Sequence, residues 1–502
     1  MSIRCHIVCL VLLLTVCLPS VAGDSIRMRN CRRGTPRPQS MMLTRGASGA
    51  QPRHVGGDFY HGNRHQLTVL VAFNDRKFMG DENATIQQWD KILNTENLTE
   101  EPFKGSVHDY FFAQSYGDFN ITFDLQYVVV SSNVAKYASS DADDENSQYL
   151  VEDIMEVLKT RDIDWSQYDW NGDGFVNQLL IVYAGKGMND GGGSNSIWPH
   201  QWWMSEHLKD NQQDVYCDPI PVTYDDKHYL VDCYCAVAEL TKMEDYGSFG
   251  TICHEYSHCF GLPDFYYGST MVVAGWDLMD YGNYNGGGYC PSGYSAHERW
   301  LMGWLTPKEL TENTTVTDMP QLAEKPFAYL VRNDGWENEY YFIENRQQTG
   351  WDAGIPGQGV VVFHIDFDPS VWPSTKVSPN SSSYKRYTIF PANNRTSTLQ
   401  SANWAYPYPS NNLLTNNSNP AATLNHENTD GSKLMNKPIT NISVTNGLAS
   451  FDFAGNNPSA IRTFAADHSF NTPCVYDLQG RRVDGQPNKG IYIVDGRKVV
   501  IK

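Results

Sequence analysis

The sequence predicts an α/β (α+β) domain with a mixed sheet, followed by an all-β sandwich domain and a small β tail. Across residues 65–308, short apolar runs alternate with segments of helical periodicity, the pattern of a sheet layered with helices. Across residues 309–455 the runs are short, alternating and closely spaced, which is typical of two packed sheets. Residues 456–502 add a few more β-type runs between glycines.

Residues 1–22 predict a secretory signal peptide. Arg4 precedes an apolar run over residues 7–18, and residues 20–22 form a small-x-small cleavage site. This run is too short to cross a bilayer and no later run is long enough, so we expect no transmembrane segment. We therefore expect a secreted or cell-surface protein, with lipid anchoring as the second choice.

The charge balance restricts the partners. The chain has 38 Lys and Arg against 57 Asp and Glu, a net charge of −19. This balance argues against nucleic acid or an anionic membrane as the main partner. An acidic surface suits an extracellular protein that binds calcium.

The segments before residue 250 predict the first domain in order. Apolar runs and helical periodicity indicate strand 67–73, helices 85–93 and 106–116, strand 121–130, helix 148–158, and strands 178–184 and 232–240. The last strand directly precedes the motif described below. We expect it to be an edge strand that can pair with an extended peptide.

Residues 169–177 have the spacing of a calcium loop. Oxygen-bearing side chains stand at positions 1, 3, 5 and 9 of the loop: Asp169, Asn171, Asp173 and Asn177. Gly174 at position 6 allows the sharp turn, but Leu180 stands where the closing Glu of an EF-hand belongs. We predict a calcium-stabilised turn that is not an EF-hand; the alternative is a plain turn of Asx residues.

The stretch from His254 to Asp264 reads H-E-x-x-H-x-x-G-x-x-D. On a helix, His254 and His258 stand on one face and can hold one zinc ion, while Glu255 can accept and return a proton. A catalytic zinc needs a third protein ligand, and Asp264 is the candidate because Gly261 ends the helix and lets the chain turn back. The alternative is an amphipathic helix whose histidines are ordinary core or surface residues.

The chain after this motif offers two supporting residues. Met279 lies in a predicted tight turn beneath the metal and can support the ligand histidines. Tyr281, two residues later, can direct its hydroxyl toward a tetrahedral oxyanion. The alternative is a glycine-rich loop with ordinary aromatic anchors. Residues 291–305 predict a further helix.

A leader over residues 23–64 is rich in Arg, Gly, Ser and Pro and precedes the first predicted strand. As a propeptide, it could block the open metal position with the thiolate of Cys31 or the carboxylate of Asp58. The alternative is that both are incidental residues of a linker.

Six cysteines cluster around the motif in sequence: Cys217, Cys233, Cys235, Cys253, Cys259 and Cys290. An exported protein can form disulfides, but sequence cannot choose among the pairings. Cys253 and Cys259 lie off the face shared by the two histidines, so we expect them to be disulfide staples of the helix and not metal ligands.

These residues resemble the immune inhibitor A family of secreted metallopeptidases, relatives of the metzincins, over roughly residues 65–370. The resemblance rests on the motif, on Trp276-Asp277-Leu278-Met279 as a Met-turn, and on Trp300, Leu301, Gly303, Trp304 and Leu305. It implies a zincin fold with an active-site helix, endopeptidase activity on proteins, and an Asp as the third zinc ligand, here Asp264.

Residues 475–502 resemble the C-terminal sorting domain of the Bacteroidetes type IX secretion route. This resemblance implies a bacterial source and a contact with that secretion machinery. The alternative is a small β-meander cap.

The sequence therefore predicts a secreted or surface zinc endopeptidase that acts on proteins or peptides as a monomer. His254, His258 and Asp264 hold zinc, Glu255 transfers the proton, and Tyr281 assists the oxyanion. One alternative is an adhesin that keeps the fold without turnover, which Glu255 argues against because a structural zinc does not need it. Another is a zinc hydrolase of sugars or amides, for which no additional carboxylate pair is evident.

Overall fold

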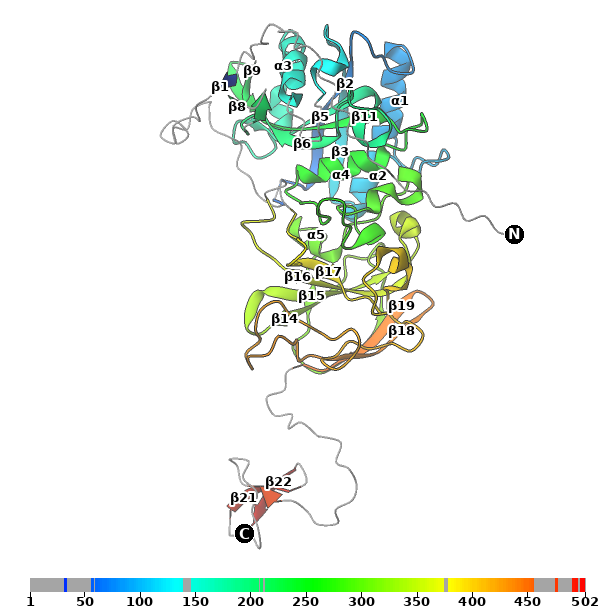
Figure 1. The fold of residues 1–502 in the computed structure, drawn as a ribbon, viewed down its shortest axis with the longest axis vertical. Coiled ribbons are helices and arrows are strands. Elements are labelled where there is room, and N and C mark those ends of the chain that lie inside the picture. The colour runs from blue at the N-terminus through cyan, green and yellow to red at the C-terminus, as the bar shows by residue number, and fades with distance from the viewer. Residues whose placement is uncertain are drawn as a thin grey trace, which may run out of the picture.

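The computed structural model describes residues 31–33, 56–57, 59–138, 146–206, 208–210, 213–373, 378–455, 475–476, 490–494 and 497–501. Figure 1 shows an upper unit of sheet and helices above a second unit built mainly of strands. Within the described ranges, no helix is both long enough and apolar enough to cross a membrane.

The upper unit is built on a five-stranded sheet with the order β3-β2-β5-β11-β6. Its strands are β2 (Gly62–Ala72), β3 (Phe119–Val129), β5 (Leu179–Lys186), β6 (His200–Trp203) and β11 (Cys233–Leu240). The first four in the order are parallel and β6 is antiparallel, so the predicted mixed sheet is observed. The predicted edge position of residues 232–240 is wrong, because β6 pairs with β11 from Cys233 to Ala236.

Helices cover both faces of this sheet. They are α1 (Glu82–Asn94), α2 (Val107–Gln114), α3 (Ser147–Leu158) and α4 (Phe249–His258). The alternation of β2 places Leu70 and Ala72 in one core with α1, α2 and α4, and Val69 and Val71 in another core with α3. The two periodicities read from the sequence therefore position α4 against one face of the sheet.

The helix predicted at residues 291–305 is much shorter in the structure. Helix α5 spans Ala296–Leu301, because the Ser295 hydroxyl and the Glu298 carboxylate form a capping box that starts it. It ends just before Gly303, which has a φ of 78°.

Short elements complete the upper unit. The strands are β1 (Cys31–Arg33), β4 (Phe175–Val176), β7 (Leu208–Asp210), β8 (Gln213–Cys217), β9 (Ile220–Tyr224) and β10 (Lys227–Val231), in two small sheets ordered β1-β8-β7 and β4-β10-β9. The 3-10 helices of the whole chain are η2 (Val134–Lys136), η3 (Trp165–Tyr168), η4 (Met188–Asp190), η5 (Ala274–Trp276), η6 (Gly282–Gly288), η7 (Gly350–Gly354) and η8 (Thr398–Asn403).

The second unit has two sheets. One has the order β12-β14-β15-β16-β17, with β12 (Lys308–Glu309), β14 (Tyr329–Asn333), β15 (Trp336–Arg346), β16 (Gly359–Asp366) and β17 (Tyr387–Ile389). The other has the order β13-β19-β18, with β13 (Thr314–Met319), β18 (Ile439–Thr445) and β19 (Leu448–Phe453). Side chains of both sheets share one apolar core that includes Val362 and Phe451. The tail contributes a sheet of β20 (Val475–Tyr476), β21 (Gly490–Val494) and β22 (Arg497–Ile501).

The two main units share a hydrophobic core. Phe342 and Phe363 of the larger sheet, together with Tyr387 of β17, belong to the same cluster of buried residues as Ile252 and Tyr256 of α4. The predicted boundary at residues 308/309 therefore divides two segments of the chain whose side chains pack together.

The cysteines differ from the prediction. Cys217 is disulfide-bonded, whereas the other described cysteines with placed side chains are free thiols: Cys233, Cys235, Cys253, Cys259 and Cys290. The expected staples at Cys253 and Cys259 are therefore absent, and α4 is held by packing instead.

Candidate active site

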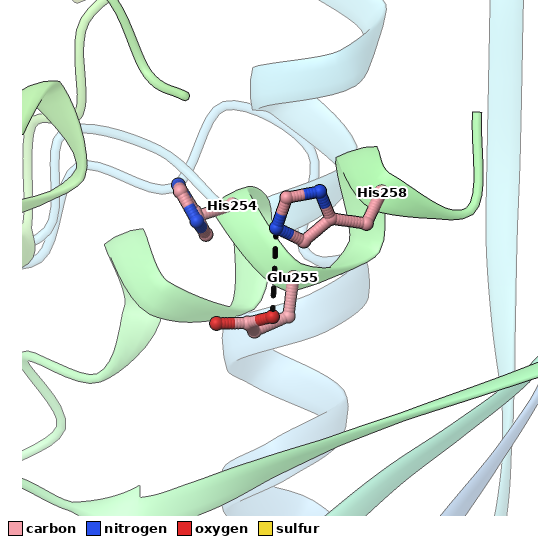
Figure 2. Close-up of side chains that lie close together, drawn as sticks. All are labelled: His254, Glu255 and His258. Atoms are coloured by element: carbon pink, nitrogen blue, oxygen red, sulfur yellow. Dashed lines mark ion pairs between the residues drawn. The ribbon is translucent and has the colours of Figure 1, made fainter. Parts of the chain in front are cut away.

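Helix α4 carries three of the predicted site residues. His254, Glu255 and His258 are at most 9 % exposed, and the two imidazole ring centroids lie 4.9 Å apart at nearly a right angle. Figure 2 shows the three side chains together on successive turns of the helix. The spacing of four residues places the two rings on one face, as the motif predicts.

Both histidines have a defined tautomer. The Nδ1 atom of His254 lies 2.9 Å from the carbonyl oxygen of Leu278, and that of His258 lies 2.7 Å from the carbonyl oxygen of Leu262. Because a carbonyl oxygen only accepts, each Nδ1 carries the proton and each Nε2 presents a lone pair. This is the arrangement of metal-binding histidines, which donate their other ring N–H to an oxygen.

Asp264 faces the same point. The helix ends at Gly261, whose φ is 81°, and the chain turns back so that Asp264 Oδ1 lies 3.0 Å from His254 Nε2 and 3.4 Å from His258 Nε2. Among the described residues, this buried oxygen has no hydrogen-bond donor. Three lone pairs thus converge on one place, which is unfavourable unless a cation lies between them.

The electrostatics of the site favour a cation. Burial lowers the pKa of His254, but the carboxylates of Asp264 and Glu255 outweigh burial and raise that pKa to about 9. Burial raises the pKa of Asp264, yet the two imidazoles hold it well below its usual range. A field that favours an imidazolium also favours a metal ion, and two imidazoles with one carboxylate are the donors that zinc accepts. The residues present therefore fit zinc.

Glu255 is close to the site without joining the nearest contacts. Its Oε2 lies 3.9 Å from His258 Nε2, and the ligand atoms of His254, Glu255 and His258 all lie within 4.8 Å of one another. Asp264 is nearer to both imidazoles than Glu255 is to His258. This difference separates a ligand carboxylate from a carboxylate that can move a proton.

A cleft with a volume of about 260 Å³ opens beside these residues. Its lining includes His254, Glu255, Trp198, Tyr266, Tyr281 and Tyr284. Tyr281 is 47 % exposed and its ring packs on Tyr284 with centroids 4.9 Å apart, so the predicted tyrosine faces the cleft.

Tyr266 was not predicted from the sequence. Its ring stacks near that of His254 at 6.4 Å, and burial together with the charge of Asp264 raises its pKa well above the usual value. The hydroxyl therefore stays protonated and can donate a hydrogen bond. Its position two residues after Asp264 was the available signal.

The Met-turn, residues 276–279, lies beside α4. Met279 is fully buried, and its backbone N–H donates to Asp277 Oδ1 at 2.8 Å while its carbonyl oxygen accepts from Phe265 N at 2.8 Å. Leu278, between them, supplies the carbonyl that orients His254. The turn thus connects the segments that carry His254 and Asp264.

Residues 64–304 match the family model described as immune inhibitor A peptidase M6, catalytic domain. This segment is an M6 peptidase domain. The chain is also similar to Immune inhibitor A of Bacillus thuringiensis subsp. alesti, with 26 % identity over 281 residues, covering 46 % of this chain and 38 % of that protein. This chain thus spans well under half the length of the relative that it matches.

The loop predicted to bind calcium lies at one end of the M6 domain sheet. Asp169 accepts hydrogen bonds from the backbone N–H groups of Asp173 and Gly174, and Asn177 accepts one from that of Trp170 at 2.6 Å. These oxygens stabilise the turn themselves, so the calcium site stays a prediction.

The two predicted leader residues are placed differently. Cys31 lies in β1, opposite Cys217 of β8 in an antiparallel ladder. Asp58 lies outside the described residues. Blocking of the M6 site by either residue stays a prediction.

Proposed function

We propose that this protein is a zinc-dependent endopeptidase that is exported and cleaves peptide bonds of extracellular proteins. The observation that carries this proposal is the convergence of His254 Nε2, His258 Nε2 and Asp264 Oδ1 beside Glu255 in an open cleft. Membership of residues 64–304 in a peptidase family supports it. The site then has the zincin arrangement, with an aspartate as the third ligand.

Zinc bound by His254, His258 and Asp264 supplies a Lewis acid that polarises the scissile carbonyl and promotes ionisation of the attacking water. Glu255 accepts one proton from that water as its oxygen bonds to the carbonyl carbon. The same carboxyl group then gives this proton to the amide nitrogen as the C–N bond breaks. Its near-complete burial strengthens both transfers by excluding bulk water.

Two tyrosines can act on the oxyanion. Tyr281 lies on the open side of the cleft, where a turn of its side chain brings the hydroxyl toward a tetrahedral intermediate. Tyr266 lines the same cleft and keeps its proton at neutral pH. We assign the oxyanion role to Tyr281 and keep Tyr266 as the competing donor.

The substrate-binding region extends beyond the cleft. A second cavity of about 400 Å³ shares Asn189, Pro199, Thr251 and Tyr284 with the cleft. Thr251 is one helical turn before Glu255 on α4, so the two cavities form a continuous path past the scissile bond. Such a path fits an extended segment of a protein substrate.

Export is also part of the proposal. Residues 1–22 act as the signal peptide, and residues 456–502 contact the secretion machinery as a sorting domain. The mature enzyme acts as a monomer, and calcium at Asp169, Asn171, Asp173 and Asn177 stabilises it.

The central test is the cleavage of casein or gelatin by the purified, processed chain. We expect activity that a chelator removes and zinc restores, and a loss of about 10²–10⁴-fold in kcat for Glu255→Gln. The matched control is Glu337→Gln, which makes the same chemical change at an exposed position of β15. Activity that survives Glu255→Gln contradicts the mechanism, and a zinc-loaded protein with no activity in any processed form favours the adhesin.

A further inference from the structure

We propose that Tyr387, on β17 of the second unit, is a positioning residue for the metal site of the M6 domain. It acts through Asp277 and the Met-turn on His254, and through Phe265 on the segment that carries Asp264. This inference rests on the proposed function, since it assumes that His254 and Asp264 hold zinc. It adds that the second unit is part of the metal site.

The first contact is a hydrogen bond between the two units. The Tyr387 hydroxyl donates to Asp277 Oδ2 at 2.7 Å, across 110 positions of the chain, and both residues are fully buried. The other carboxylate oxygen of Asp277 accepts from Met279 N at 2.8 Å. One carboxylate is therefore held by the second unit on one side and holds the Met-turn on the other.

The Met-turn carries this constraint to the metal ligand. Leu278 lies between Asp277 and Met279, and its carbonyl oxygen accepts the Nδ1 proton of His254 at 2.9 Å. Partners of this kind fix the tautomer and the orientation of a ligand imidazole. Three consecutive hydrogen bonds thus connect Tyr387 to His254, from β17 to α4.

The ring of Tyr387 makes a second, separate contact. It stacks on Phe265 with centroids 3.7 Å apart and an interplanar angle of 11°. Phe265 directly follows Asp264, and its N–H donates to the carbonyl oxygen of Met279. Asn380 reinforces this contact, because its side-chain amide donates to the carbonyl oxygens of both Phe265 and Tyr387. The segments bearing two of the three ligands therefore meet the same tyrosine.

These contacts lie outside the matched domain. Asn380 and Tyr387 follow residue 304, where the match to the M6 catalytic domain ends. The carboxylate of Asp277 is fully buried, and a buried charge needs hydrogen-bond donors to remain in place. The M6 domain supplies the Met279 N–H, and the second unit supplies the phenol hydroxyl.

The test uses the full chain with Tyr387→Phe, which keeps the ring and removes the hydroxyl. We expect zinc affinity, measured by competition with a chromophoric chelator, to fall about 10–100-fold, with a lower kcat and little change in KM. The visible spectrum of the cobalt-substituted protein should shift as well, because it reports ligand geometry without requiring turnover.

The matched control is Tyr406→Phe. Tyr406 is also a fully buried tyrosine of the second unit, but its hydroxyl has no hydrogen-bond partner among the described residues and its ring lies in the other core. We expect this variant to keep the parent's zinc affinity and cobalt spectrum. If Tyr387→Phe fails to fold, Asp277→Asn interrupts the same path while retaining an oxygen for Met279 N.

The outcomes separate the two proposals. Parent-like zinc affinity and cobalt spectrum in Tyr387→Phe overturn the positioning role, even if the variant melts at a lower temperature. Additive losses in the Tyr387→Phe, Asp277→Asn double variant also overturn it, since residues on one path should not be additive. A parent chain that binds no zinc at His254 contradicts the proposed function instead.

Discussion

His258 and Leu262 are joined by a hydrogen bond of 2.7 Å in which the imidazole Nδ1 donates to the backbone carbonyl at the end of α4. The last turn of a helix leaves carbonyl groups without intrahelical partners. Here the chain just beyond that turn orients a metal ligand, and Gly261 then allows the return that brings Asp264 to the same site. One local sequence motif thus builds both the ligand and its support.

The role of Asp264 leads to a first prediction. We expect Asp264→Asn to weaken zinc binding by more than the 10–100-fold typical of an outer-shell partner, because a neutral amide replaces the only carboxylate that lies within 3.5 Å of both imidazoles. Chelator competition measures the change. Asp226→Asn, in a turn with a φ of 57° that Asn also accepts, is the control. Equal zinc affinity in the two variants would leave Glu255 as the third ligand.

Much of this site could be predicted because its geometry is local. Residues four apart on a helix share a face, so His254 and His258 could be placed together without a structure. Asp264 follows the helix by a short turn whose glycine is visible in the sequence. The strands of the main sheet were equally accessible, since their apolar runs are nearly continuous.

The rest depends on contacts between distant parts of the chain. Nothing near Tyr387 in the sequence indicates Asp277 as its partner, because the pairing arises only when the second unit packs on α4 and the Met-turn. The position of β11 inside the sheet likewise depends on β6, a four-residue strand in a segment read as an aromatic patch. The start of α5 at Ala296 reflects a capping box that the broader helical pattern concealed.

The interface between the two units predicts an unusually costly substitution. Arg346 binds Asp352 through two hydrogen bonds of 2.7 and 2.8 Å, and both side chains are buried. We expect Asp352→Asn to lower the free energy of unfolding by about 3–5 kcal/mol, because it leaves the charge of Arg346 without its main partner.

The exposed pair of Arg332 and Glu309, 3.2 Å apart, provides the control for this effect. Glu309→Gln makes the same change from carboxylate to amide in a solvated pair and should cost less than about 1 kcal/mol. Urea unfolding of both variants measures the difference. Similar losses in the two variants would show that Arg346 finds another partner in Glu344, which lies 3.3 Å away.

The calcium loop predicts a thermal shift. Calcium at a concentration of a hundred times its Kd should stabilise the chain by about 2.7 kcal/mol if it binds only the folded state. Asp169→Asn should abolish the shift, because it removes a charge from the site and keeps the acceptor for Gly174 N. A zinc-loaded sample should be used so that the loop alone responds. Identical shifts for the parent and the variant would locate calcium elsewhere.

His297 predicts how stability depends on pH. Its side chain is fully buried among aromatic rings, including those of Trp300, Tyr340 and Trp372, and burial lowers its pKa to about 3. Its ordinary pKa is 6.5. Between these values the unfolded chain binds a proton that the folded chain does not, so this residue makes stability fall as the pH falls.

The expected slope is about 1.4 kcal/mol per pH unit at pH values well below 6.5. Carboxylates also titrate in this range, so the contribution of His297 must be isolated by comparing the parent with His297→Phe. Phenylalanine suits the aromatic surroundings and does not titrate, and the His297 Nε2 atom that it removes has no hydrogen-bond partner among the described residues. Urea unfolding at pH 5 and pH 7 should therefore show a smaller loss of stability on acidification in the variant. Parallel losses would mean that His297 is protonated in the folded protein, with its charge stabilised by the faces of the surrounding rings.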